Sequence, residues 1–192
     1  MLETVTEIFS QFNFLSPKDL FELASIAKLR MVKKDEHLIS EGDLCYDTFM
    51  VLKGLFRHYT VDENGVDRTL LFVPERRPTA SPDTILLNNA AIENIIALEN
   101  SLVLKIDTRV FGKIASDNVR LLKLKSQVYE QVIISNVAQI KFLTLLNPED
   151  RYVHFCKTFP DLEQRIKQKY LASYLGVTPT SLSRMRARLA KG

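Results

Sequence analysis

The sequence has few of the residues that build covalent or metal-bound frameworks. Its two cysteines, Cys45 and Cys156, are isolated in the 192-residue chain, so it offers neither a disulfide framework nor a Cys-x-x-Cys metal or redox site. An iron–sulfur cluster is excluded for the same reason. The histidines, His37, His58 and His154, lack the His-x-His spacing of a metal-dependent cupin, and we expect ordinary polar roles for them. We therefore predict no metal and no cofactor.

Long apolar runs and catalytic motifs are also missing. The most apolar stretches, such as ALENSLVLKI, are interrupted by charge and fall well short of the ~18 residues that cross a membrane. The first residues, MLETVTEIFSQF, carry acids where a secretory signal carries bases. The sequence contains no nucleophile elbow, phosphate-cradling loop or clustered acid pair. We expect a cytoplasmic protein without a membrane partner, and we assign no catalytic residue and no enzyme activity.

Acidic residues are absent from one long segment, and this absence points to a partner. Residues 1–116 carry a net charge of −4, whereas residues 117–192 carry +7. From Arg165 to Lys191 there are seven bases and no acid. Lys and Arg side chains bind polyanions by releasing counterions from phosphates. A solvated helix face is the alternative that charge alone leaves open.

The hydrophobic spacing in the same segment favours the polyanion. Two short helices are predicted to pack together through apolar side chains, with small Ala172 at their crossing and Gly176 at the turn between them. The apolar positions are Leu171, Leu175, Val177, Leu182, Met185 and Leu189. Thr178 is a good N-cap residue and Pro179 suits the first helical position, so the second helix should begin at about Pro179. This spacing is typical of a helix-turn-helix.

The N-terminal part has a different pattern. Helices are predicted at residues 3–11 and 17–27, the second with a capping box formed by Ser16 and Asp19. Short β-rich runs follow, separated by turns, and a hairpin turn is predicted at residues 62–65. The runs are LRMVKK, HLIS, DTFMVLKG, LFRHYTV, RTLLFV, NIIAL and SLVLKID. Many short strands at close spacing predict a sandwich or roll with room for a small ligand.

Both ends of the chain resemble the Crp/Fnr superfamily of transcription regulators. The segment ISEGDLCYDTFMVLKGLFRHYTVDENGVDRTLLF resembles the family's β-roll, and KYLASYLGVTPTSLSRMRARL resembles its DNA-binding helix pair. The resemblance implies an α+β chain that binds double-stranded DNA as a homodimer. We expect a cyclic-nucleotide-binding-like jelly-roll in residues 1–116, a dimerisation helix in 117–146 and a winged-helix-like helix-turn-helix in 147–192. The final wing is expected to be missing, and RNA polymerase is a further expected partner.

The pattern of residues within 117–146 gives an independent test of the expected dimerisation helix. Residues 117–146 contain no Gly or Pro, and Asn147-Pro148 should end the helix. A heptad-like seam, here called the α-seam, recurs in steps of three and four. Its members are Val119, Leu122, Ser126, Tyr129, Ile133, Asn136, Ile140 and Leu143. A single amphipathic helix that packs on its own roll is the alternative.

The stretch that should hold a cyclic nucleotide lacks the necessary charges. Residues 78–104 contain no Lys, Arg or Gly, and Glu93 lies near the position where the family's phosphate-binding Arg is expected. Burying an unpaired phosphate is costly. Only Asp83 matches the ribose-binding acid of the family pattern. We predict that the usual cyclic-nucleotide contacts are lost, and we keep Asp83 and Ser126 as candidate residues for an unidentified small-molecule effector.

The family pattern also assigns the DNA-reading residues. Arg184 matches the recognition-helix Arg that contacts guanine, whereas Thr180 stands where members often carry Glu, so the operator should differ from the family's best-known one. The predicted DNA-binding set is Thr178, Thr180, Ser181, Ser183, Arg184, Arg186 and Arg188, with Arg186, Arg188 and Lys191 on the DNA backbone. Two alternatives stay open: a cyclic-nucleotide or other small-ligand module without DNA output, and a purely structural adaptor.

Overall fold

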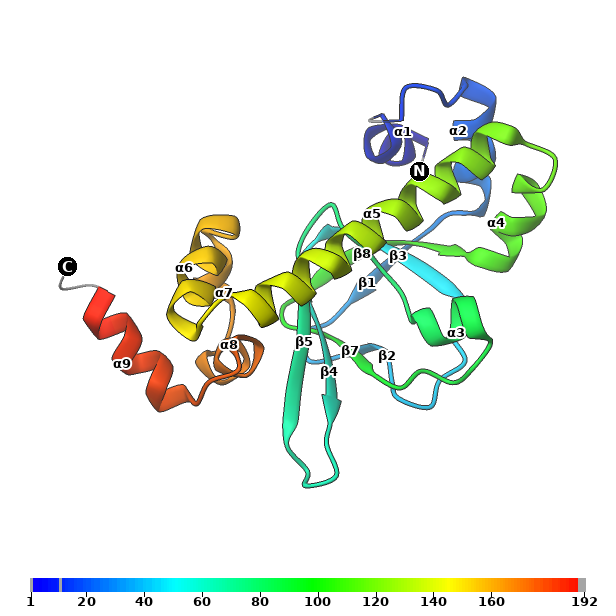
Figure 1. Cartoon of the computed structure of the whole chain (residues 1–192). Coiled ribbons are helices and arrows are strands. Elements are labelled where there is room, and N and C mark those ends of the chain that lie inside the picture. The colour runs from blue at the N-terminus through cyan, green and yellow to red at the C-terminus, as the bar shows by residue number, and fades with distance from the viewer. Residues whose placement is uncertain (1, 11, 190–192) are drawn as a thin grey trace. The chain divides into compact units, whose positions relative to one another are not determined.

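The computed structural model describes residues 2–10 and 12–189, and the chain folds as an α+β protein (Figure 1). All seven predicted β-rich runs form strands, and a two-residue strand, β6, was not predicted. The strands are β1 Lys28–Val32, β2 His37–Ile39, β3 Asp47–Lys53, β4 Phe56–Val61, β5 Asp67–Val73, β6 Pro78–Thr79, β7 Asn94–Ala97 and β8 Ser101–Asp107.

The strands form two four-stranded sheets, ordered β1-β8-β3-β6 and β2-β7-β4-β5. The pairs β1–β8, β3–β8, β3–β6 and β2–β7 are antiparallel. The predicted hairpin turn joins β4 to β5, where the Asp62 amide donates to the Val66 carbonyl at 3.0 Å. The predicted β-roll is therefore confirmed.

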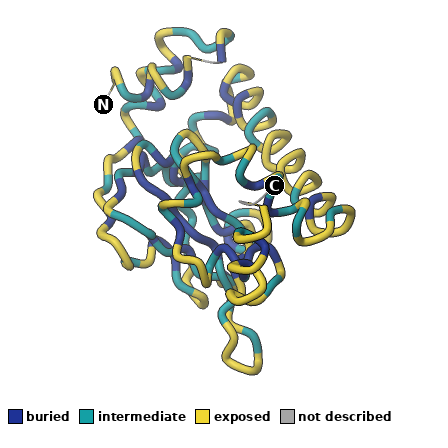
Figure 2. Tube along the Cα trace, turned by 90° about the vertical axis from the view of Figure 1, so that its left-hand side faces the viewer, coloured by how far each residue is buried: buried dark blue, intermediate teal, exposed yellow. Residues whose placement is uncertain are grey.

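Apolar side chains from both sheets form the core of the roll. The residues on this core that have no exposed surface are Phe49, Val51, Leu55, Phe56, Ile95, Ala97 and Val103. Figure 2 shows the buried stretches lying along the strands, with exposed residues on the turns and on the outer faces of the helices. Hydrophobic burial of this kind stabilises the roll by about 1.5–3 kcal/mol per large side chain.

The described chain divides into two compact units. Unit 1 contains residues up to 58 and residues 72–131, and unit 2 contains residues 59–71 and residues from 132 onward. The long helix α5, Val119–Leu145, covers most of the predicted helical range and contributes to both units. The domain boundaries predicted at 116/117 and 146/147 stay a prediction.

Unit 1 carries four further helices beside its strands and part of α5. Both predicted N-terminal helices are present, whereas α3 and α4 were not predicted. They are α1 Leu2–Phe9, α2 Pro17–Ile26, α3 Pro82–Leu87 and α4 Thr108–Ala115. Buried Leu121 and Leu124 of α5 pack in one apolar cluster with Val5 and Phe9 of α1 and with Leu23 of α2. One face of α5 is therefore committed to its own chain.

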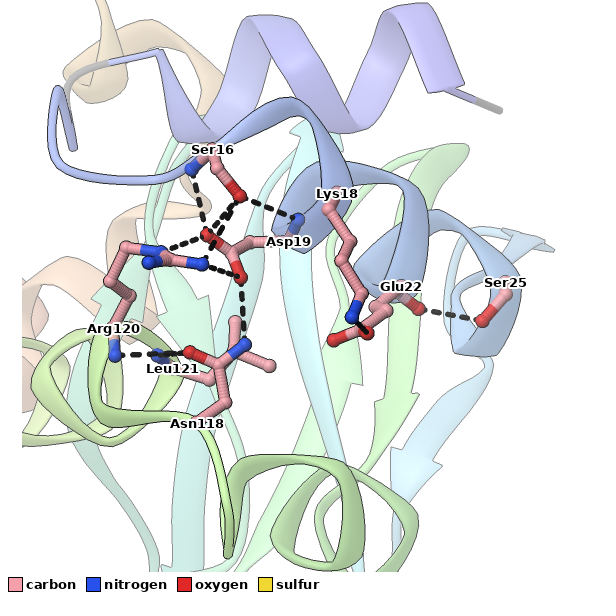
Figure 3. Close-up of polar contacts among 8 residues, drawn as sticks. All are labelled: Ser16, Lys18, Asp19, Glu22, Ser25, Asn118, Arg120 and Leu121. Atoms are coloured by element: carbon pink, nitrogen blue, oxygen red, sulfur yellow. Dashed lines mark hydrogen bonds and ion pairs between the residues drawn. The ribbon is translucent and has the colours of Figure 1, made fainter.

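A buried carboxylate fastens the start of α5 to α2 (Figure 3). Asp19 has no exposed surface, and Arg120 Nε contacts its Oδ2 at 2.5 Å. Asn118 Nδ2 donates to Asp19 Oδ1 at 2.7 Å, while Asn118 Oδ1 accepts from the Arg120 amide at the start of α5. The predicted capping box is also present, since the Ser16 amide and hydroxyl both donate to Asp19 Oδ2. The hydrogen bond from Arg120 holds the pKa of Asp19 well below its usual range.

The carboxylate at Asp19 makes an acid-sensitive contribution to stability. Its folded-state pKa lies below the unfolded value of 3.8, so its contribution is present above about pH 4 and is lost as the pH falls through the lower, folded pKa. We expect Asp19→Asn to lower the free energy of unfolding by about 2 kcal/mol at neutral pH and to flatten this acid dependence. Urea unfolding at neutral pH and at successively lower pH measures both effects.

Glu22→Gln is the matched control. Glu22 is on the same helix and pairs with exposed Lys18 at 3.9 Å, an arrangement that contributes little to stability. If Asp19→Asn lowered the free energy of unfolding no more than Glu22→Gln does, the buried contact between Asp19 and Arg120 would not be what holds α5 to α2.

Candidate nucleic-acid interface

Two helices of unit 2 form the predicted helix-turn-helix. They are α8, Gln168–Leu175, and α9, Pro179–Leu189. Gly176 joins them with φ of +71°, a left-handed conformation that favours glycine, and the Val177 amide donates to the Ala172 carbonyl at 2.9 Å. Leu171, Leu175 and Leu182 are fully buried, as the predicted packing requires.

The start of α9 is fixed by the residues predicted from sequence. Thr178 Oγ1 accepts a hydrogen bond from the Ser181 amide at 3.1 Å, which is N-cap geometry, and Pro179 takes the first helical position. Gln168 Nε2 at the start of α8 donates to the Pro179 carbonyl at 2.9 Å. The N-terminal ends of the two helices are therefore tied together.

The outer face of α9 is polar and basic. Thr178, Thr180, Ser181, Ser183 and Arg184 are all exposed. Buried Leu182 and Met185 hold the opposite face of the same helix against the rest of unit 2. Exposed hydroxyl and guanidinium groups on one helix face are able to reach base edges and phosphates. The DNA-binding role of these residues stays a prediction.

Arg186 does not face outward as the sequence analysis expected. Its Nη2 pairs with Glu163 Oε1 at 2.9 Å, and its guanidinium lies 5.7 Å from the ring centroid of Tyr152. Only 30% of its side chain is exposed. Helical periodicity placed Arg186 on the polar face, but a long side chain at the border of that face can turn inward when an acid is available there.

Glu163 is the centre of this cluster. It belongs to the short helix α7, Leu162–Arg165, and accepts from Tyr152 Oη at 2.5 Å and from Cys156 Sγ at 3.5 Å. Tyr152 and Cys156 are both on helix α6, Pro148–Thr158. Burial raises the pKa of both groups, and the contact with Glu163 adds to the effect, so the Cys156 thiol is a hydrogen-bond donor at neutral pH. The cluster joins α6, α7 and α9.

The last turn of α9 also departs from expectation. Arg188 is exposed, but it pairs with Glu149 at the start of α6. Leu189 was expected to face inward and is 38% exposed. Lys191 lies outside the described residues.

A contact that the sequence analysis missed is made by Arg151. Its guanidinium donates to two backbone carbonyls, those of Leu146 at 3.0 Å and Leu175 at 2.7 Å. Backbone carbonyls occur at every residue, so such a contact leaves no side-chain pattern in the sequence. The basic residues Lys167 and Lys169 at the start of α8 are exposed and lie close to the ring of Tyr170.

The two candidate effector residues lie on different elements of unit 1. Asp83 is in α3, and exposed Ser126 on α5 donates to Glu130 at 3.0 Å. An open pocket of about 430 Å³ in unit 1 is lined mainly by polar residues, and neither Asp83 nor Ser126 is among them. It is lined by Leu38, Asp43, Leu44, Cys45, Tyr46, Asp47, Lys105, Asp107 and Arg109.

Glu93 lies in the interior of the roll, where it already has a partner. Its Oε1 lies 3.0 Å from His58 Nδ1, and only 12% of the Glu93 side chain is exposed. His58 Nε2 lies 2.6 Å from Thr79 Oγ1, so the imidazole joins β4 to β6 and to the segment before β7. The expectation of an ordinary polar role for His58 agrees with these contacts.

Several solved structures are similar in fold to this chain. FixK2 from Bradyrhizobium japonicum has a TM-score of 0.74 at 15% identity, covering 86% of this chain and 85% of that chain. A Crp/Fnr-family protein from Eubacterium rectale has a TM-score of 0.73 at 16% identity, covering 97% and 89%. The global regulator CLP from Xanthomonas campestris has a TM-score of 0.72 at 10% identity, covering 92% of each.

The chain has the Crp/Fnr fold. No protein-family model and no curated protein matches the sequence, so the likeness rests on how the chain is arranged in space. The fold predicted from the roll and helix-pair motifs is confirmed. No helix within residues 2–10 and 12–189 has both the length and the apolar character of a membrane span.

The Crp/Fnr helix pair should depend on Arg186 for stability rather than for contact with a ligand. We expect Arg186→Gln to lower the free energy of unfolding by about 1 kcal/mol, because it removes the pair with Glu163. Arg184→Gln is the matched control on the same helix and should leave stability within about 0.5 kcal/mol of the wild type, because Arg184 is exposed. Chemical unfolding measures the stability of both variants. Equal stability of the two would contradict a stabilising role for Arg186.

Proposed function

We propose that the chain is a sequence-specific, DNA-binding transcription regulator of the Crp/Fnr type that acts as a homodimer. The observation that carries this proposal is the exposed, acid-free face of α9, held outward by buried Leu182 and Met185. A helix with this character on a helix-turn-helix suits insertion into a DNA major groove. RNA polymerase is a further proposed partner, because the proposed role is in transcription.

The proposed DNA contacts divide into base readers and phosphate binders. Arg184, Ser183 and Thr180 lie on the exposed face and are proposed to reach base edges, with Arg184 bidentate to a guanine. Thr178 and Ser181 at the start of α9, and Arg188, are proposed to bind phosphates. Lys167 and Lys169 join the phosphate binders, since the bond from Gln168 to Pro179 ties their helix end to that of α9.

The α-seam is proposed to join two copies of the chain. All eight of its positions are exposed, including Val119 at 80%, Ile133 at 60% and Ile140 at 60%. An apolar stripe that faces solvent along a helix is costly unless a partner covers it. Leu121 and Leu124 already satisfy the packing of α5 on its own chain, so the α-seam remains for a second copy. The two α9 helices would then enter successive major grooves about 34 Å apart.

The effector pocket is proposed to have lost the usual cyclic-nucleotide phosphate contacts. Residues 78–104 supply no cation, and Glu93, whose side chain is 12% exposed, carries a carboxyl group paired with His58. A phosphate beside this carboxylate would meet repulsion in place of the Arg pairing that a buried phosphate requires. Any effector of this chain is therefore expected to be of another class.

Removing Arg184 should weaken specific binding more than general binding. We expect Arg184→Ala to cost about 1–3 kcal/mol on a duplex selected by the wild type, and to relax base preference at one position of each half-site. A gel-shift titration on the selected duplex and on its single-base variants measures both quantities.

Arg109→Ala in unit 1 is the control for loss of an exposed Arg, and it should leave DNA affinity unchanged. An unchanged base preference in Arg184→Ala would mean that another surface reads the DNA. If the wild type showed no salt-dependent binding to any duplex, the small-ligand module without DNA output would be favoured.

A charge in the α-seam should separate the two copies. We expect Ile133→Asp to shift the protein from dimer to monomer at micromolar concentration, because a buried carboxylate without a partner is costly at a helix interface. Ser135→Asp is the matched control, since Ser135 is exposed on α5 outside the α-seam. Sedimentation equilibrium measures the mass, and a dimeric Ile133→Asp variant would rule out the α-seam as the interface.

A further inference from the structure

Arg151 occupies an unusual position in unit 2, next to the ends of two helices. It lies in the first turn of α6, and its Nε donates to the carbonyl of Leu146, one residue beyond the end of α5. Its Nη1 donates to the carbonyl of Leu175, the last residue of α8. One side chain therefore joins the C-terminal end of α5 to the C-terminal end of α8.

The chemistry of these helix ends suits a guanidinium. The last carbonyls of a helix have no partner within the helix and carry partial negative charge, so a cation that donates to them is favourable. Arg has five donors in a rigid planar fork, whereas the Lys ammonium is a compact point charge. Lys at this position would keep the charge but would not span both carbonyls with the same geometry.

Gly176 leaves the space that the guanidinium fills. A Cβ atom built at Gly176 would lie 2.9 Å from Arg151 Nη1, closer than ordinary side-chain contacts allow. Glycine at this turn therefore serves both the left-handed backbone and the approach of Arg151 to the Leu175 carbonyl.

A second attachment joins the same two helices at a different place. Tyr174 Oη of α8 donates to Gln139 Oε1 of α5 at 2.9 Å, and the Tyr174 ring stacks on Phe142 with centroids 5.5 Å apart. Two separate attachments fix the rotation of one helix against another. With one removed, α8 keeps the other attachment and its buried side chains, but its rotation against α5 is less closely fixed.

We propose that Arg151 is a positioning residue that fixes the orientation of the α8–α9 pair on the C-terminal part of α5. This inference rests on the proposed function for its consequence: in a dimer joined through α5, the orientation of each pair sets the spacing between the two DNA-reading helices. Arg151 thereby selects operators by the distance between their half-sites, without contacting DNA.

The test compares operators that differ only in half-site spacing. Duplexes carry the selected half-sites with base pairs added or removed between them, and wild type and Arg151→Lys are titrated on each. We expect Arg151→Lys to lose about tenfold in affinity at the selected spacing while its binding to a single half-site is unchanged, because pre-organisation is lost and the contacts are not. Its affinity profile across spacings should be flatter than that of the wild type.

Arg109→Lys in unit 1 is the matched Arg exchange and should keep the wild-type profile. A profile for Arg151→Lys identical to that of the wild type would overturn the inference. An equal loss on every duplex, the single half-site included, would also overturn it, since that result indicates a contact with DNA or a loss of fold.

A distance measurement decides the inference without DNA. Spin labels are placed on exposed Ser135 of α5 and Ser183 of α9, with Cys45 and Cys156 replaced by serine and the labelled chain diluted in unlabelled protein. Pulsed dipolar spectroscopy should give a broader distance distribution in Arg151→Lys than in the wild type. An equal width would refute the positioning role. If the wild type binds no duplex, the proposed function is refuted. The width of the distance distribution then tests the positioning role of Arg151 by itself.

Discussion

The packing of α8 against α9 across Gly176 is the constraint on which the rest of the DNA-reading unit depends. The left-handed backbone at Gly176 turns the chain sharply enough for Leu171, Leu175 and Leu182 to share one core. Because these side chains are fully buried, the opposite side of α9 has to face outward. The exposed face follows from the hydrophobic core, and the hydroxyl and guanidinium groups on it are available to a partner.

Charges in unit 2 serve two purposes that their spacing along the chain does not separate. Arg184 and Arg186 are two residues apart on one helix, yet Arg184 is exposed and Arg186 is held by Glu163 and Tyr152. Arg151 donates to two backbone carbonyls. A cation at a helix end or beside a half-buried acid stabilises the fold, whereas an exposed cation remains free to bind phosphate. A count of the cations in unit 2 is therefore larger than the number of cations available to bind a partner.

The roll combines an apolar core with a few polar side chains that contact one another. Apolar residues such as Phe49 and Ile95 form the core of the roll, and these do not depend on a ligand. The polar positions near the core are occupied by Glu93, His58 and Thr79, which contact one another. Internal contacts of this kind satisfy buried polar groups without a ligand. That this roll has lost the usual cyclic-nucleotide phosphate contacts is our proposal, and the contacts among Glu93, His58 and Thr79 support it.

The sequence by itself determined the elements that depend on local rules. Short β-rich runs separated by turns predicted all seven main strands, Ser16 and Asp19 predicted the first capping box, and Thr178, Pro179 and Gly176 predicted the start of α9. Each of these signals acts within a few residues of the chain. Only the tertiary structure decided that Asp19 binds Arg120, that Arg186 turns to Glu163 and that Arg151 joins two helix ends. These contacts join different secondary-structure elements, up to about a hundred residues apart, and a single sequence carries no pattern that pairs one charge with a particular distant acid or carbonyl.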